Sequence, residues 1–596
     1  MAKKLLMGNE AIALGALRAG VNVVSGYPGT PSTEVLETIA KHKKKGVYIE
    51  WSVNEKAALE VAAGAAYAGA RSLVTMKQVG LNVASDPLMS LAYIGIKGGM
   101  VVLAADDPGP ISSQTEQDTR HFAQFAHLPV FDPSTPEEAY NLIAEAFLYS
   151  EKYNTPVIFR PTTQVCHACA SIELSDQETV HPIDGFVKDS KWVIFPRLSY
   201  QNHLRIIENE EKMSLDFSHF KYNTITGEGE KGIAASGVSA VYVQEVLENT
   251  KDKAKLWKLT TAHPFPEQQA LAFLKGLNEV LVVEELDPVI EDALLRICGK
   301  HNLSVKIRGR VSKDTNIAGS NDYEKVKKAI DGYFGRTTAQ ASCHLPQLPV
   351  RPPVLCAGCP HRASFYSVKK ALQKLKLPAV FSGDIGCYTL GNAMPLNMVD
   401  TCLCMGAGIT IAQGLERAEP RVKHLAFVGD STFFHTGIPG IINAVYNETD
   451  ITVIILDNST TAMTGHQPHP GTGKTMMGNI TEKISIEKVL TGCQVKMIKT
   501  ADPLDLQEAV KAVTEAVEYQ GVSAVIFRSP CIALTKTEKT LQVTEACTGC
   551  LRCLKEIGCP AMTKTEDNKA AIQTALCSGC TLCSQVCPAK AIGGIE

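Results

Sequence analysis

HLAFVGD (residues 424–430) and ITVIILDN (residues 451–458) are short apolar runs that each end in a polar residue. Their aliphatic and β-branched composition predicts two buried parallel strands, joined by a helix at residues 433–447. Neighbouring parallel strands end at the same edge of an open α/β sheet, where ligands bind, so Asp430 and Asn458 are expected to lie close together. A carboxylate and an amide oxygen suit a Mg²⁺ ion that also binds a diphosphate.

The same alternation of strand-like and helical stretches continues through most of the 596-residue chain. Leu73–Met76 and Met100–Ala104 are predicted strands, and Glu55–Gly69 is a predicted helix. This alternation favours doubly wound parallel sheets, and a chain of this length exceeds what one core supports. We therefore predict two doubly wound domains at residues 1–185 and 354–535, an intermediate α/β domain at 190–337, a Pro-rich linker at 338–353 and a cysteine-rich domain at 541–596.

The composition is that of an ordinary globular protein, with 45% hydrophobic residues, 20% charged residues and a net charge of −3. No basic excess or long charge run indicates a nucleic-acid partner. The N-terminus lacks the apolar stretch of a signal peptide, and the apolar segments are too short to cross a bilayer. These features predict a cytoplasmic protein without a nucleic-acid or membrane partner.

The last 50 residues hold eight of the chain's 19 cysteines, in two runs that each end in Cys-Pro. The second run has the bacterial ferredoxin spacing, in which three close thiolates bind one 4Fe–4S cluster and the fourth reaches the other cluster. A disulfide knot or a zinc ribbon is the alternative, but zinc sites take cysteine pairs and disulfides are rare in reducing cytosol. Crossed ligation assigns one cluster to Cys547, Cys550, Cys553 and Cys587 and the other to Cys559, Cys577, Cys580 and Cys583.

GDS at residues 429–431 and DN at residues 457–458 together resemble the thiamine-diphosphate motif, which is Gly-Asp-Gly followed by Asn-Asn. The third glycine and the first asparagine of the motif are replaced here by serine and aspartate, and a strand that ends in Gly-Asp is common by itself. The resemblance implies cofactor binding by Gly429, Asp430, Ser431, Asn458 and Thr460, with the metal held by Asp430, the Asn458 side chain and the Thr460 carbonyl.

Thiamine enzymes also need a glutamate that hydrogen-bonds the aminopyrimidine and promotes loss of the reactive proton. Glu55 is the candidate, because it opens an Ala- and Gly-rich helix that a cofactor or a partner domain can approach closely. The plainer interpretation is that Glu55 only stabilises the helix dipole at the first turn. The residues by themselves leave both interpretations open.

These segments together resemble the 2-oxoacid:ferredoxin oxidoreductases, most closely the α-subunits of the indolepyruvate branch, which fuse two thiamine domains and a ferredoxin domain. The resemblance spans nearly the whole chain and includes GYPGTPSTE at residues 26–34, CAGCPHR at 356–362 and GDIGC at 383–387. It implies that Glu55 activates the cofactor and that Thr30 contacts the substrate carboxylate. TTQVCH at residues 162–167 departs from the family pattern, which leaves the roles of Cys166, His167 and Cys169 open.

The resemblance also leaves open a third cluster beside the thiamine. In related oxidoreductases a Cys-x₂-Cys pair, a later Gly-Cys and a Ser-Pro-Cys bind such a cluster. Buried structural cysteines are the alternative, and the indolepyruvate branch is usually described with two clusters. The matching residues are Cys356, Cys359, Cys387 and Cys531.

The resemblance implies oxidative decarboxylation of an arylpyruvate such as indolepyruvate to aryl-acetyl-CoA and CO₂, with coenzyme A as acyl acceptor. The electrons would pass through the 4Fe–4S clusters to ferredoxin, because cysteine-ligated clusters have low potentials. Implied partners are a small β-subunit and ferredoxin, in a dimer of αβ pairs. The alternatives are the same chemistry on pyruvate or 2-oxoglutarate, a non-oxidative thiamine enzyme, or a non-catalytic electron-transfer subunit.

Overall fold

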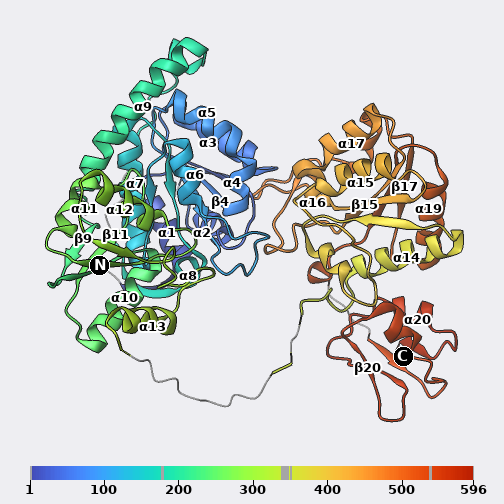
Figure 1. Cartoon of the computed structure of the whole chain (residues 1–596). Coiled ribbons are helices and arrows are strands. Elements are labelled where there is room, and N and C mark those ends of the chain that lie inside the picture. Colours follow the sequence, from blue (N-terminus) through green and yellow to red (C-terminus); the bar gives the residue numbers. More distant parts are fainter. Residues whose placement is uncertain are drawn as a thin grey trace. The chain divides into compact units, whose positions relative to one another are not determined.

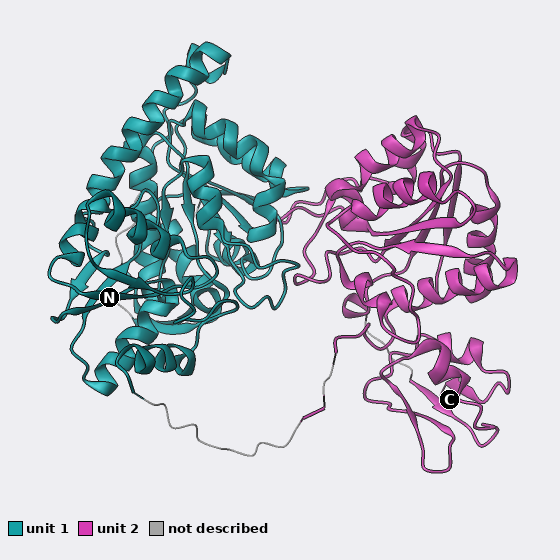
Figure 2. Cartoon of the chain, in the orientation of Figure 1, with its two compact units in different colours: residues 1–344 teal, residues 345–596 magenta. Residues whose placement is uncertain are grey.

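The computed structural model describes residues 3–43, 45–175, 180–336, 348–349, 352–535 and 540–594. The chain divides into two compact units, residues 1–344 and 345–596 (Figure 1, Figure 2). Most of the linker predicted at residues 338–353 lies outside the described residues. Of the helices in the described ranges, none combines the length and the apolar character that a bilayer crossing requires.

Unit 1 begins with a six-stranded sheet of order β3-β2-β4-β5-β7-β6, in which all neighbours pair in parallel. The central strand β5 is buried along its whole length, as expected where helices cover both faces of a parallel sheet. An antiparallel pair, β1 (Lys3–Met7) with β8 (Cys169–Glu173), lies apart from this sheet. The other elements are β2 (Val23–Gly26), β3 (Tyr48–Trp51), β4 (Ser72–Lys77), β5 (Met100–Ala105), β6 (Val130–Phe131), β7 (Val157–Phe159), α1 (Gly8–Arg18), α2 (Thr33–His42), α3 (Glu55–Tyr67), α4 (Gln78–Val83), α5 (Ser85–Ile94), α6 (Thr119–Ala126), α7 (Pro136–Tyr153) and α8 (Thr163–His167).

A second sheet in unit 1 has the order β13-β12-β10-β11-β9, and only its edge strand β9 is antiparallel to its neighbour. Apolar layers pack on both faces of this sheet. Its elements are β9 (Thr224–Thr226), β10 (Lys231–Ser236), β11 (Lys255–Leu259), β12 (Glu279–Val283), β13 (Lys306–Arg308), η1 (Ser190–Trp192), α9 (Pro196–Phe217), α10 (Gly237–Thr250), α11 (Glu267–Leu274), α12 (Val289–Lys300) and α13 (Tyr323–Tyr333).

Unit 2 contains a five-stranded parallel sheet of order β14-β15-β16-β18-β17. Successive residues of β16 point to opposite faces, so Ile454 and Leu456 pack in one apolar layer and Val453 and Ile455 in the other. The elements are β14 (Ala379–Ser382), β15 (Lys423–Gly429), β16 (Ile451–Asp457), β17 (Met497–Ala501), β18 (Ser523–Arg528), α14 (Pro360–Leu375), α15 (Ala407–Ala418), α16 (Asp430–Thr432), α17 (Ile438–Tyr446), α18 (Ile486–Gly492), α19 (Leu506–Glu518), η2 (Cys387–Asn392), η3 (Phe433–Gly437), η4 (Pro470–Thr472) and η5 (Ile532–Leu534).

The two strands predicted from HLAFVGD and ITVIILDN are confirmed as β15 and β16. The single helix predicted at residues 433–447 is wrong in detail. A π-helical turn, η3, comes first, and α17 begins at Ile438. Pro439 explains the interruption, because its ring nitrogen cannot donate the helical hydrogen bond.

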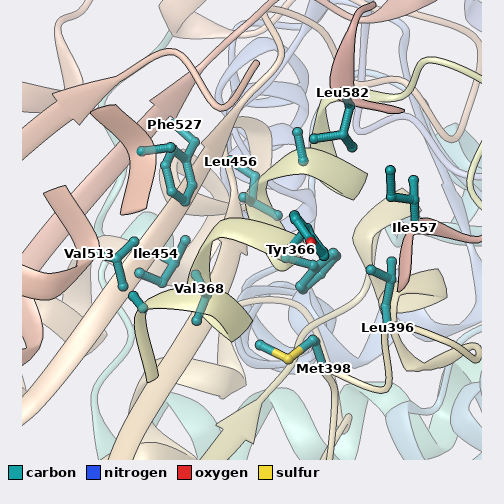
Figure 3. Close-up of a cluster of buried hydrophobic side chains, with 14 of the residues drawn as sticks. Tyr366, Val368, Leu396, Met398, Ile454, Leu456, Val513, Phe527, Ile557 and Leu582 are labelled. Carbon is teal, nitrogen blue, oxygen red and sulfur yellow. The ribbon is translucent and has the colours of Figure 1, made fainter. Parts of the chain in front are cut away.

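The cysteine tail, residues 541–594, has much less regular structure. Two antiparallel pairs of three-residue strands form its framework, and it shares an apolar cluster with the sheet of unit 2. Figure 3 shows Ile557 and Leu582 of the tail in the same cluster as Tyr366 of α14 and Leu456 of β16. The tail is therefore packed against the sheet domain. Its elements are β19 (Leu541–Val543), β20 (Met562–Lys564), β21 (Ala570–Ile572), β22 (Ile592–Gly594), η6 (Cys553–Ile557) and α20 (Leu582–Val586).

Candidate active site and cysteine clusters

Asp430 follows directly after β15, and its carboxylate is buried among hydrogen-bond donors. It accepts hydrogen bonds from the backbone N–H of Ser431 at 2.8 Å and of Ser459 at 2.7 Å, and from Nε2 of His469 at 3.1 Å. Burial would raise the pKa of Asp430, but these hydrogen bonds and the interaction with His469 hold the pKa below its ordinary value. Asp430 is therefore an ionised carboxylate at neutral pH.

Asn458 follows the neighbouring strand β16 and is also buried. Its Nδ2 donates to Nε2 of His361 at 3.2 Å, and its Oδ1 accepts from the N–H of Thr460 at 3.3 Å. Burial lowers the pKa of His361 to about 4, so this imidazole is neutral and can accept the hydrogen bond. A Cβ added to Gly429 would lie 2.6 Å from the ring of Tyr388, so this position needs glycine.

The two departures from the thiamine motif have structural partners. The hydroxyl of Ser431 accepts a hydrogen bond from Thr461 at 2.9 Å, which ties α16 to the loop after β16. Asp457 accepts a hydrogen bond from Nε of Arg528 at 2.8 Å. The side chains of Ser431 and Asp457 thus form hydrogen bonds that stabilise the loops. Asp430 and Asn458 occupy the two positions at which the motif has its metal ligands.

Asp430, Asn458 and Thr460 would offer a carboxylate, an amide oxygen and a peptide carbonyl, which is a hard oxygen donor set of the kind Mg²⁺ prefers. The residues therefore fit the metal and the diphosphate that the motif implies. Sequence reasoning missed His469 and His361, which contact the site from 39 and 97 residues away. Neither contact has a local sequence pattern that would reveal it.

Glu55 in unit 1 is the first residue of α3 and is only 6% exposed. Asn54 caps this helix, with its side chain accepting from the N–H of Ala57 at 2.8 Å. A Cβ on Gly80 of α4 would lie 2.6 Å from Oε1 of Glu55, so the absence of a side chain at residue 80 makes room for the carboxylate. Glu55 is thus held in a fixed and mostly buried position.

Thr30 lies in the loop after β2, the strand that pairs with β3 before Glu55. Asn9 donates to the carbonyl of Pro31 at 2.6 Å, and Ser32 donates to the carbonyl of Gly29 at 2.9 Å. These bonds fix the loop while Thr30 stays half-buried. Thr30 and Glu55 therefore follow neighbouring strands of one sheet.

The segment that departs from the family pattern is mainly structural. Gln164 of α8 accepts a hydrogen bond from Tyr242 of α10 at 3.1 Å, which links the two parts of unit 1. Cys166 is fully buried, and burial raises the pKa of its thiol well above the ordinary value. His167 and Cys169 are exposed. The structure thus gives Cys166 a packing position rather than a reactive one.

Four cysteines of the tail line a single small cavity in unit 2. They come from both sequence runs, which is the combination that crossed ligation predicts. The backbone N–H of Ala591 lies 3.3 Å from Sγ of Cys587, a contact of the kind that tunes cluster potentials. The four are Cys547, Cys550, Cys553 and Cys587.

The other four cysteines of the tail interact electrostatically with one another. Burial and the neighbouring thiols raise the pKa of Cys583 to about 12, and Cys580, Cys559 and Cys577 are the strongest of these neighbours. The N–H of Gly579 lies 3.4 Å from Sγ of Cys577. Within the described residues, no group of three or more His, Cys, Asp or Glu side chains already has metal-binding geometry. Thiols with raised pKa values must lose protons when a metal binds.

The cysteines proposed for a third cluster also converge. Burial and then the thiols of Cys531 and Cys356 raise the pKa of Cys387 to about 11. Burial, with smaller contributions from Cys356 and Cys387, raises the pKa of Cys359 to about 12. Thiols from three separate segments, around residues 356–359, 387 and 531, therefore interact near the start of α14.

Family models match both units. "Pyruvate flavodoxin/ferredoxin oxidoreductase, thiamine diP-bdg" matches residues 14–202, and "Thiamine pyrophosphate enzyme, C-terminal TPP binding domain" matches residues 384–527. A solved structure with some similarity is a 2-oxoglutarate:ferredoxin oxidoreductase from Magnetococcus marinus, at 20% identity and a TM-score of 0.43, covering 52% of this chain and 62% of that one.

Full-length relatives are more similar. The chain is 40% identical to "Indolepyruvate oxidoreductase subunit IorA" of Methanothermobacter thermautotrophicus, over 99% of this chain and 97% of the relative. It is 39% identical to the subunit of the same name from Pyrococcus horikoshii, over 98% and 96% of the two chains. Because the similarity covers both units and the cysteine tail, the chain belongs to the IorA family of indolepyruvate oxidoreductase subunits, among the thiamine-dependent 2-oxoacid oxidoreductases.

Proposed function

We propose that this chain oxidatively decarboxylates arylpyruvates, indolepyruvate above all, to aryl-acetyl-CoA and CO₂, and passes the electrons to ferredoxin. In this proposal residues 1–185 bind the pyrimidine of thiamine diphosphate, residues 354–535 bind its diphosphate, and residues 541–596 carry two 4Fe–4S clusters. A small β-subunit completes the enzyme, in a dimer of αβ pairs. Relatives named indolepyruvate oxidoreductase that align over nearly the full length support this assignment.

The oxygen donors at the sheet edge have the first role in the mechanism. Thiamine diphosphate, when bound, supplies the carbanion chemistry that releases the carboxyl group of a 2-oxo acid. Asp430, Asn458 and the Thr460 carbonyl would hold its Mg²⁺, and His469 keeps the Asp430 carboxylate oriented through its 3.1 Å hydrogen bond. The ionised state of Asp430 supplies charge to balance the metal.

Glu55 and Thr30 have the second role, at the pyrimidine end of the cofactor. Glu55 would hold the aminopyrimidine of bound thiamine diphosphate through a hydrogen bond and would serve as the proton relay that the activation of this cofactor requires. Its buried place against Gly80 keeps the carboxylate in one position and away from water. Thr30 donates a hydrogen bond to the substrate carboxylate from its fixed loop.

The cysteines remove the electrons one at a time. Cys547, Cys550, Cys553 and Cys587 would hold one cluster, and Cys559, Cys577, Cys580 and Cys583 would hold the other. Burial favours the protonated thiol of Cys583. Cluster binding would require this thiol to lose its proton, because the thiolate is the form that binds iron. The mutual interaction of Cys356, Cys359, Cys387 and Cys531 supports a third cluster, which these thiols would hold.

One observation carries the proposal: buried Asp430 and Asn458, at the ends of β15 and β16, share a compact unit with eight cysteines in two groups. A thiamine enzyme without electron transfer would have no use for the cysteines. A non-catalytic electron-transfer subunit would not need a buried carboxylate such as Asp430.

The test is an anaerobic assay of the chain with its β-subunit, coenzyme A and a viologen dye. We expect dye reduction with indolepyruvate and phenylpyruvate, and little with pyruvate or 2-oxoglutarate. Equal rates on all four acids would refute the aryl preference but keep the reaction class. No dye reduction with any of them, in protein that contains thiamine diphosphate and iron, would refute the proposed function.

A further inference from the structure

Lys77 is the last residue of β4, the strand that pairs with β2 on the side opposite to β3. Three neighbouring parallel strands therefore bring these residues to one edge of the sheet. Thr30 follows the middle strand, Glu55 follows the strand on one side and Lys77 ends the strand on the other side. A Cβ added to Gly29 would lie 3.1 Å from Cγ of Lys77 and 3.4 Å from Cδ. The stem of Lys77 thus runs directly past the backbone of the Thr30 loop.

The ammonium group of Lys77 is incompletely paired. Its Nζ donates to the carbonyl of Ser112 at 3.2 Å, which leaves two of its three donors for a ligand. No ion pair joins Lys77 to a carboxylate among the described residues. Loop 107–113 is held around Asp107, whose Oδ2 accepts the N–H groups of residues 111, 112 and 113 at 3.0 to 3.1 Å. The acceptor for Lys77 is therefore fixed in place.

The surroundings of this lysine favour an added anion. Burial lowers the pKa of Lys77, and the charges of Glu55 and Asp107 oppose this only in part. A half-buried cation with a lowered pKa gains stability when an anion binds beside it, because the anion replaces the lost hydration. Gln78, the next residue, is fully buried; it accepts a hydrogen bond from the N–H of Asp107 and donates one to the carbonyl of Thr115, so both sides of this loop are held.

We propose that Lys77 and Thr30 together bind the carboxylate of the 2-oxo acid substrate. The strand that ends in Lys77 and the strand before Glu55 lie on opposite sides of the strand before Thr30. This inference rests on the proposed function and adds a charged residue to its substrate site. Thr30 is neutral, so Lys77 supplies the positive charge that an anionic substrate needs.

The chemistry predicts which kinetic constant depends on Lys77. The carboxylate leaves as neutral CO₂, so its attraction to a cation weakens as the carbon–carbon bond breaks. Lys77 therefore stabilises the bound substrate more than the transition state. Its loss is expected to raise KM without a matching fall in kcat.

The experiment compares Lys77→Met, Lys77→Arg and Lys97→Met in the anaerobic αβ enzyme, with thiamine content and thermal unfolding measured for each. Lys97 is a matched control, because it also donates to a backbone carbonyl, that of Gly185 at 3.0 Å, but lies beyond the opposite end of the strands. We expect Lys77→Met to raise KM for indolepyruvate by about 10- to 100-fold and to leave KM for coenzyme A unchanged. Lys77→Arg should recover most of the loss, and Lys97→Met should resemble the wild type.

A second readout uses two inhibitors that differ only in charge, indolepropionate and its neutral amide. The wild type should prefer the anion by about tenfold, and Lys77→Met should abolish this preference. An unchanged KM and an unchanged anion preference in Lys77→Met would overturn the proposal, as would loss of bound thiamine in both Lys77 variants. A wild type that turns over no 2-oxo acid would instead overturn the proposed function itself.

Discussion

The sheet domain of unit 2 and the cysteine tail present their candidate ligands in opposite ways. In the sheet domain, Asp430 and Asn458 follow regular strands, and hydrogen bonds from neighbouring residues hold both side chains. In the tail, the framework is two pairs of three-residue strands, and half-buried cysteines form much of the interior. A packed sheet fixes the side chains at its strand ends through the fold itself, whereas a site in so small a core depends on its ligand for stability.

The largest expected effect is at the sheet site. Asp430→Ala should abolish binding of thiamine diphosphate and lower kcat by about 100-fold or more, because a charged metal ligand is lost. Iron content and cluster absorbance should stay at the wild-type level. Asp457→Asn is the matched control, because the side chain of Asp457 accepts a hydrogen bond from Arg528 and is not one of the proposed metal ligands. The Asp457→Asn variant should keep the cofactor. Retention of thiamine diphosphate in Asp430→Ala would contradict the assignment of the metal site.

The next effect tests the dependence of the tail on its clusters. Cys587→Ala should disturb the cluster of Cys547, Cys550 and Cys553, although these residues are distant in sequence. Partial proteolysis should then cut within residues 541–596 while the sheet domain stays intact. Cys493→Ala is a control outside the three proposed groups. If spectroscopy shows that Cys587→Ala removes only the cluster of Cys577, Cys580 and Cys583, crossed ligation is wrong.

A smaller effect concerns the contact between the two regions. Arg362 of α14 is buried and donates to the carbonyls of Ile557 and Gly558 in the tail, at 2.9 and 2.8 Å. Arg362→Met leaves these carbonyls unpaired and should lower the free energy of unfolding of the tail by about 3 kcal/mol. The urea dependence of cluster absorbance measures this loss. Arg417→Met, which alters an exposed arginine, should leave the urea concentration at the midpoint of tail unfolding unchanged.

The smallest effect is a pH dependence in the sheet domain. Burial raises the pKa of Asp384 to about 7, although N–H groups of Ile385 and Gly406 oppose the shift. From the ordinary pKa up to about 7, the unfolded chain has lost the proton that the folded chain keeps. The free energy of unfolding therefore falls as pH rises through this window, by at most about 1.4 kcal/mol per pH unit. Asp384→Asn should flatten this slope, and an identical slope in the variant would contradict the burial argument.

The sequence predicted the parallel sheets because their signal is local: apolar runs such as Ile451–Asp457 match the observed strand closely. It also placed Asp430 and Asn458 at one sheet edge, since strand ends determine that position. It did not predict His469, His361 or Lys77. Their roles depend on contacts across 39, 97 and 35 residues, which no spacing rule encodes. The π-helical turn before α17 was missed for a local reason, the proline at residue 439.

The central claim is that the thiamine site supplies the electrons that the cysteine tail carries. The most direct test mixes the anaerobic αβ enzyme with indolepyruvate, freezes it rapidly and records the electron paramagnetic resonance of its clusters. We predict that reduced 4Fe–4S signals appear in the wild type within a turnover and are absent in Asp430→Ala, whose clusters dithionite still reduces. Oxidised clusters in a wild type that consumes indolepyruvate, or substrate-dependent reduction in Asp430→Ala, would contradict the account.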